Sequence, residues 1–103
     1  MKRYLANKHN KRLLRTYWLT VTDKPKPPCK IALHRIYNTS IGQRAYDDDN
    51  LVSSYKGVRD IIADLLVPGL EPGQADAAVH GLRWEYGQSK GQPERTMITI
   101  EEL

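Results

Sequence analysis

Three consecutive aspartates and an asparagine, residues 47–50, stand immediately before a strongly helical stretch, residues 51–66. Like charges repel, so neighbouring carboxylates are costly to gather unless something positive lies among them. The N–H groups and dipole of a helix N-terminus supply part of that charge. A hard cation such as Mg²⁺, bound through carboxylate oxygens, would supply the rest. The alternative is an acidic turn in which one aspartate only caps the helix.

The spacing of these aspartates predicts a two-carboxylate clamp. In an extended segment side chains alternate, so Asp47 and Asp49 are expected to point the same way, leaving Asn50 or Asp49 to cap the helix. Lys56 follows two helical turns after Asp49 and leans toward the helix N-terminus, where it could balance the carboxylates or stabilise charge on a phosphate. Its alternative role is a surface pair with Asp60.

The elements that must position these residues follow from periodicity. Residues 3–20 are expected to form a helix whose basic stripe is Lys8, Lys11, Arg12 and Arg15. The prolines of residues 23–28 make that segment a connector. Residues 30–37 alternate as a strand. The helix over 51–66 has the core positions Leu51, Tyr55, Val58, Ile62 and Leu65.

The C-terminal third reads as two alternating strands, residues 81–86 and 95–100, joined by the turn 87–93. The aromatic residues of these strands and of the first helix could stack on bases, but their periodicity favours core packing: Tyr17, Trp18, Trp84 and Tyr86. The order of elements predicts a small α+β protein, with a basic helix over 1–22 and a metal-site helix over 50–66 in a single domain, 1–103.

Composition limits the class of protein. No apolar run approaches the roughly 20 residues that a membrane span needs, and we expect no membrane partner. The single cysteine, Cys29, excludes an internal disulfide and suits a reducing, cytoplasmic location. Residues 1–35 hold ten Lys or Arg against Asp23 alone, whereas residues 36–103 are net acidic. A basic part to hold phosphates and an acidic part to hold metal is what a metal-dependent nuclease requires.

The residues Asp47-Asp-Asp-Asn-Leu51, followed by Lys56-Gly-Val-Arg-Asp60 and Trp84-Glu-Tyr-Gly-Gln88, carry a resemblance. They are similar to the Asp-x-Asp-Asn-Leu motif, the downstream helix and the closing strands of the RusA family of Holliday-junction resolvases, in particular its small phage and prophage members. The likeness covers roughly residues 8–100.

The resemblance implies a RusA-like α+β fold, with a small mixed sheet packed against two helices, in a homodimeric endonuclease that nicks four-way or branched DNA with Mg²⁺ or Mn²⁺. It assigns Asp47 and Asp49 to the metal, with Asp76 as third carboxylate and Glu71 as fallback. Lys56 would act on the phosphate, and Lys8, Lys11, Arg12 and Arg15 would contact DNA.

Three departures from the family pattern stand beside this resemblance. Ser53 occupies a position that is lysine in the family, and Ala77 replaces the second residue of an Asp-Asp pair. The predicted first helix also leaves little room for a leading strand. Two other functions therefore remain: a DNA-binding accessory protein that does not cut, and a structural or anti-host interaction protein without a nucleic-acid role.

Overall fold

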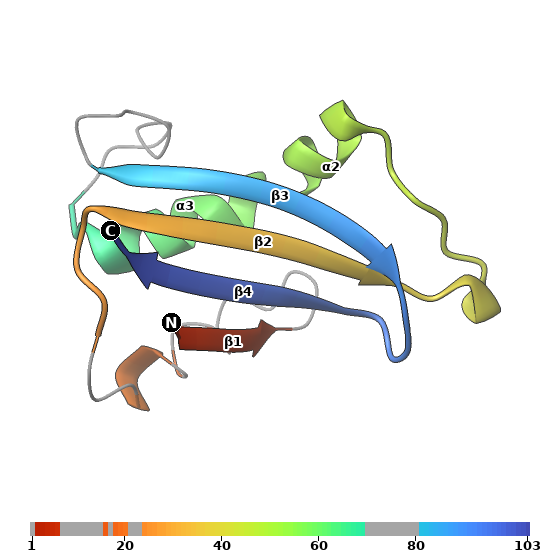
Figure 1. Cartoon of the computed structure of the whole chain (residues 1–103), viewed down its shortest axis with the longest axis horizontal. Coiled ribbons are helices and arrows are strands. Elements are labelled where there is room, and N and C mark those ends of the chain that lie inside the picture. Colours follow the sequence, from red (N-terminus) through yellow and green to blue (C-terminus); the bar gives the residue numbers. More distant parts are fainter. Residues whose placement is uncertain (1, 7–15, 17, 21–23, 70–80) are drawn as a thin grey trace.

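The structure, a computed structural model, describes residues 2–6, 16, 18–20, 24–69 and 81–103. Figure 1 shows the strands side by side with α3 behind them. The elements in chain order are β1 (Lys2–Ala6), β2 (Cys29–Tyr37), the short 3-10 helix η1 (Thr39–Ile41), α2 (Asp48–Ser54), α3 (Lys56–Leu66), β3 (Leu82–Lys90) and β4 (Arg95–Glu102). The predicted α+β class is confirmed, although α2 and α3 both come from the stretch expected to form one helix.

The four strands form one mixed sheet in the order β1-β4-β2-β3. Strands β2 and β3 are parallel, whereas β4 is antiparallel to both β2 and β1. Parallel neighbours need a long crossover, and here α2 and α3 provide it. The crossover brings the end of β3 beside the end of β2, so the loop after β2 and the start of α2 lie at this end of the sheet.

The prediction of a hairpin between the last two strands is wrong, because β2 lies between β3 and β4. The turn residues are those of a hairpin, but turn chemistry does not distinguish a hairpin from a connection that passes over one strand. Residues 91–94 cross two strand spacings, about 10 Å, which so short a segment can reach. The central place suits β2, since Cys29, Ile31 and Leu33 are completely buried.

One face of the sheet carries the core. Alternate residues of β2 and β4 that face the helices are buried, including Ile31, Leu33, Ile98 and Ile100. The opposite face carries charged side chains. There, Lys30 Nζ lies 4.0 Å from Glu85 Oε2 and 3.6 Å from Glu101 Oε2. The alternation predicted for the strand 30–37 is therefore confirmed.

The expected helix over 51–66 is confirmed in its core positions but is interrupted at Tyr55. Leu51, Tyr55 and Ile62 are buried, and Val58 and Leu65 pack against the core. The interruption follows a serine pair and precedes Gly57, residues that weaken a helix interior. Ser54 Oγ also donates to the carbonyl of Leu51 at 2.7 Å, a local bond that competes with the regular helix.

The prediction of a helix from residue 3 is wrong for the first residues, since Lys2–Ala6 form β1 and pair with β4. A leading strand is thus present where the sequence was expected to leave little room for one. Residues 2–6 are a strand because they form backbone hydrogen bonds with β4, and the spacing of apolar residues in the sequence carries no information about that pairing. Residues 16 and 18–20 are helical, in agreement with the prediction, and residues 7–15 lie outside the described part of the chain.

Candidate functional site

The acidic cluster, Asp47 to Asp49, lies at the start of α2. Asp47 is the N-cap, in extended conformation (φ −69°, ψ 168°), and its Oδ1 accepts the N–H of Asn50 at 2.8 Å. Asp48 and Asp49 form the first turn, and all three aspartates are exposed. Their charges meet the positive end of the helix dipole, which lowers the cost of gathering them.

The expected geometry of a clamp on an extended segment is not what the structure has. Asp48 already begins the helix, so strand alternation does not relate Asp47 to Asp49. The capping residue is Asp47, not Asn50 or Asp49, because its carboxylate satisfies one of the free N–H groups of the first turn. The prediction that Asn50 or Asp49 caps the helix is therefore wrong. An aspartate does cap it, as the alternative of an acidic turn expected, but the cap is Asp47, two or three residues earlier.

Lys56 is exposed and is the first residue of α3. The expectation that it lies two turns above Asp49 assumed a continuous helix, and the interruption at Tyr55 removes that relation. The alternative pair is also absent: within residues 24–69, no ion pair joins Lys56 to Asp60. Lys56 is therefore an exposed cation at the start of α3, and neither relation expected from a continuous helix is established for it.

Several predicted site residues lie outside the described residues: Lys8, Lys11, Arg12, Arg15, Glu71 and Asp76. Among the residues that the structure does describe, no group of three or more His, Cys, Asp or Glu side chains could hold a metal ion. The donors at the start of α2 nevertheless suit a hard cation. One oxygen of Asp47 remains beyond its capping bond, and Mg²⁺ is commonly bound by one or two carboxylates together with water.

The segment that leads into the acidic cluster is attached to the sheet by Gln88 of β3. Tyr46 N donates to Gln88 Oε1 at 3.0 Å, and Gln88 Nε2 donates to the carbonyl of Tyr46 at 2.6 Å. A single side-chain amide thus satisfies both backbone groups of the residue before Asp47. These two bonds fix where the acidic cluster begins relative to the sheet.

The buried side chain of Arg35, on β2, contacts the same segment before α2. Its guanidinium carbon lies 3.7 Å from the centroid of the Tyr46 ring and 5.3 Å from that of Tyr37. Nη1 donates to the carbonyl of Arg44 at 2.8 Å and to Gln88 Oε1 at 3.4 Å. Only 8% of Arg35 is exposed. A buried guanidinium needs such acceptors and rings around it, since an uncompensated buried charge is costly.

The alternation predicted for residues 30–37 puts Arg35 on the same strand face as Ile31 and Leu33, but no role was assigned to Arg35 from the sequence. The signal was present: an arginine on an otherwise apolar face must find partners when that face is buried. What the sequence did not supply was the identity of those partners. Tyr46 and Gln88 come from other elements, 11 and 53 residues away along the chain.

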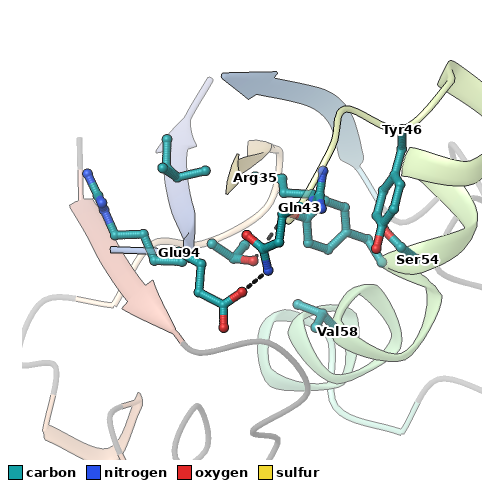
Figure 2. Close-up of a pocket in the computed structure, with 10 residues that line it drawn as sticks. Arg35, Gln43, Tyr46, Ser54, Val58 and Glu94 are labelled. Carbon is teal, nitrogen blue, oxygen red and sulfur yellow. Dashed lines mark hydrogen bonds between the residues drawn. The ribbon is translucent and has the colours of Figure 1, made fainter. Parts of the chain in front are cut away.

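A cavity of about 320 Å³ opens between this segment, the junction of α2 with α3, and the start of β4. Figure 2 shows Arg35, Tyr46, Ser54 and Val58 around it, with Gln43 bonded to Glu94. Tyr55 and Thr96 also line it, and the Tyr55 hydroxyl lies 3.2 Å from Thr96 Oγ1. Burial raises the pKa of Tyr55, and the Thr96 bond opposes that effect.

The aromatic residues behave as core residues, as their periodicity predicted. Trp18, Trp84 and Tyr86 pack against the core cluster, and Tyr17 lies outside the described residues. Tyr86 stacks on Tyr55 with ring centroids 6.4 Å apart, and its hydroxyl accepts from Arg59 Nη1 at 2.9 Å. These rings therefore connect the helices to β3.

Comparisons with protein-family models, with curated proteins and with solved structures give no match to this chain. Among the described residues, no helix is both long enough and apolar enough to cross a bilayer.

Proposed function

We propose that this protein is a divalent-metal-dependent endonuclease that cuts four-way or other branched DNA. The observation that carries the proposal is the acidic cluster: three exposed carboxylates at the start of α2, on a segment attached to the sheet through Arg35 and Gln88. Carboxylates gathered at a fixed, solvent-open position are suited to a hard cation and a phosphodiester.

In the proposed mechanism Asp47 and Asp49 provide carboxylate oxygens for Mg²⁺ or Mn²⁺, with Asp76 as the third ligand. The chemistry supplied there is polarisation of the phosphodiester and activation of a water molecule. Lys56, an exposed cation at the start of α3, would offset negative charge that develops on the phosphate. Ser53 does not offer this charge.

DNA is the proposed substrate because of the charge distribution and the resemblance. Ten of the 16 Lys and Arg residues lie within residues 1–35, and Lys8, Lys11, Arg12 and Arg15 among them are proposed to follow the DNA backbone. The motif 47–51 with its following helical segment supports a RusA-like enzyme. Such an enzyme would be a homodimer, with a two-fold axis that matches a junction, in the cytoplasm of a bacterial or phage-infected cell.

The test is nicking of an end-labelled four-way junction, compared with a linear duplex of the same sequence. We expect paired nicks on the junction with Mg²⁺ or Mn²⁺ and none with Ca²⁺ or with chelator. The variant Asp49→Asn is expected to abolish nicking and to retain junction binding, because it removes one charge without changing size. Equal nicking by this variant would contradict the assignment of Asp49.

A second candidate is a junction-binding accessory protein that does not cut. The capping bond of Asp47 favours it, because a carboxylate that holds a helix end has a structural reason to be present without any metal. Ser53, in the place of the family's lysine, favours it as well. This candidate predicts junction binding that a chelator leaves intact, with no nicks in Mg²⁺ or Mn²⁺.

A further inference from the structure

The cavity beside the acidic cluster combines aromatic walls with polar groups at its edge. Tyr46, Tyr55 and Val58 provide the apolar surface, and the Tyr46 ring is covered on one side by the Arg35 guanidinium at 3.7 Å. A volume of about 320 Å³ lies at the lower end of the range of small-molecule pockets, about 300–1,000 Å³. The space suits one planar ring system.

The charges around the cavity favour a ligand that carries a negatively charged group. Arg35 and Arg95 line it, and among the described residues of the lining Glu94 is the one carboxylate. Glu94 is engaged by the Gln43 side chain, whose own Oε1 accepts the backbone N–H of Asn38 at 2.7 Å. The lining therefore carries net positive charge with one carboxylate already bonded (Figure 2).

The cavity is also next to the proposed metal site. Tyr46, in its wall, is directly followed by Asp47, and Ser54, also in its wall, is the last residue of α2. The acidic cluster lies at the start of α2 and Ser54 at its end. Seven helical residues span about 10 Å, so the acidic cluster is no more than about one helix length from the Ser54 side of the cavity. A DNA strand held at the acidic cluster has its neighbouring nucleotide within reach of the cavity.

We propose that this cavity receives one unstacked nucleobase of the branched DNA, next to the phosphodiester held at the acidic cluster. The inference rests on the proposed function and specifies how the substrate is recognised. Bases at a branch point are cheaper to unstack than bases within a duplex, so a pocket for one base favours branched DNA over linear DNA. Tyr46 offers a ring for stacking, and Arg95, also in the lining, supplies a positive charge for the attached phosphate.

The test uses four-way junctions that carry 5-iodouracil at single positions around the branch point, bound with Ca²⁺ and irradiated. Iodouracil forms crosslinks with aromatic side chains that it contacts, and mass spectrometry identifies the crosslinked residue. We expect crosslinks to Tyr46 from one or two positions near the branch point. Val58→Phe fills the cavity and is expected to lower the crosslink yield and to weaken junction binding roughly 5- to 150-fold, the range of one lost base stack.

The matched control is Val52→Phe, which adds the same ring on α2 at a residue that does not line the cavity. It is expected to crosslink as the unsubstituted protein does. Ser54→Phe fills the cavity from the other helix, so the test does not depend on the folding of one variant, and circular dichroism verifies each fold. Crosslinks that map only to other residues, or that persist in both filled variants, would overturn the base pocket while junction binding and nicking remain intact. Absence of any junction binding would overturn the proposed function and this inference together.

Discussion

The side chain of Gln88 bonds both backbone groups of Tyr46: it accepts the N–H at 3.0 Å and donates to the carbonyl at 2.6 Å. Gln88 belongs to β3, and Tyr46 belongs to the irregular segment before α2, so the two bonds connect segments 42 residues apart. Arg35 donates to the same Gln88 oxygen and covers the Tyr46 ring. The position of the acidic cluster thus depends on a polar contact within the fold.

Replacing Gln88 with methionine is expected to lower the free energy of unfolding by about 1–3 kcal/mol. Methionine has a similar length but leaves the Tyr46 N–H and carbonyl without their partners, and unsatisfied, partly buried backbone groups are costly. Urea denaturation followed by circular dichroism measures the change. Gln92→Met is the control, because the side chain of this exposed glutamine donates to Ser40 Oγ at the surface, and its loss should cost less than about 0.5 kcal/mol. Equal effects of the two substitutions would contradict the role of Gln88.

Arg35→Lys is expected to destabilise the protein by about 1–3 kcal/mol even though the charge is kept. A lysine cannot stack a planar group on Tyr46 and cannot donate to the Arg44 carbonyl and to Gln88 from the same fork. Thermal and urea unfolding report the loss. Arg83→Lys, on the exposed face of β3, makes the same chemical change and should be nearly neutral. A neutral Arg35→Lys would mean that the charge alone, without the planar shape, stabilises this site.

Burial of the Cys29 thiol makes stability depend on pH at the alkaline end. Cys29 is completely buried, and burial, followed by the nearby charge of Glu102, raises the pKa of the thiol above its ordinary value. The folded state therefore keeps the proton that the unfolded state releases. The stabilisation is complete below the pKa of the unfolded thiol and is lost as the pH rises through the higher pKa of the folded protein.

The expected result is that the stability difference between the unsubstituted protein and Cys29→Ala declines above about pH 8.5, where the unfolded thiol ionises. Urea midpoints measured from pH 7 to pH 10.5 for the two proteins give this difference, since their other titrating groups are the same. The thiol should also react with a disulfide reagent only after unfolding. Rapid labelling of the folded protein would contradict the burial of Cys29.

Residue periodicity predicted those elements that can be recognised without knowing which other segments they contact. The alternation around Ile31 and Leu33 predicted β2, and the spacing of Leu51, Tyr55 and Ile62 predicted the helical region, because both depend on one buried face. The chain order of β3 and β4 was also predicted. Their neighbours in the sheet were not, because a turn between two strands carries no information about a third strand that lies between them.

The candidate site, too, was predictable from the sequence only in its local features. The acidic residues 47–49 were predicted from their sequence, since three consecutive carboxylates form a local signal. Their conformation was not, because Asp47 is the cap and the helix begins at Asp48, two or three residues earlier than an extended segment over 47–49 allows. The contacts of Arg35 with Tyr46 and Gln88 were missed altogether, since they require the parallel pairing of β2 with β3, which places Arg35 opposite Gln88.

The two roles proposed for Asp47 can be separated by substitution. Asp47→Ala removes the acceptor for the Asn50 N–H and is expected to cost about 0.5–2 kcal/mol of stability. Asp47→Asn keeps an oxygen that caps equally well, so stability should change by only a few tenths of a kcal/mol. If Asp47 is a metal ligand, both variants lose nicking, because a neutral amide is a much weaker ligand for Mg²⁺ than a carboxylate.

Urea unfolding and junction nicking, measured on the same preparations, distinguish the outcomes, with Asp60→Asn on α3 as the control that should leave both properties unchanged. An Asp47→Asn variant that is stable and still nicks would limit Asp47 to capping α2 and would assign the metal to the remaining carboxylates. A variant that is stable and binds junctions without nicking would assign Asp47 to the chemistry, because the cap would then be intact and only the charge would be missing.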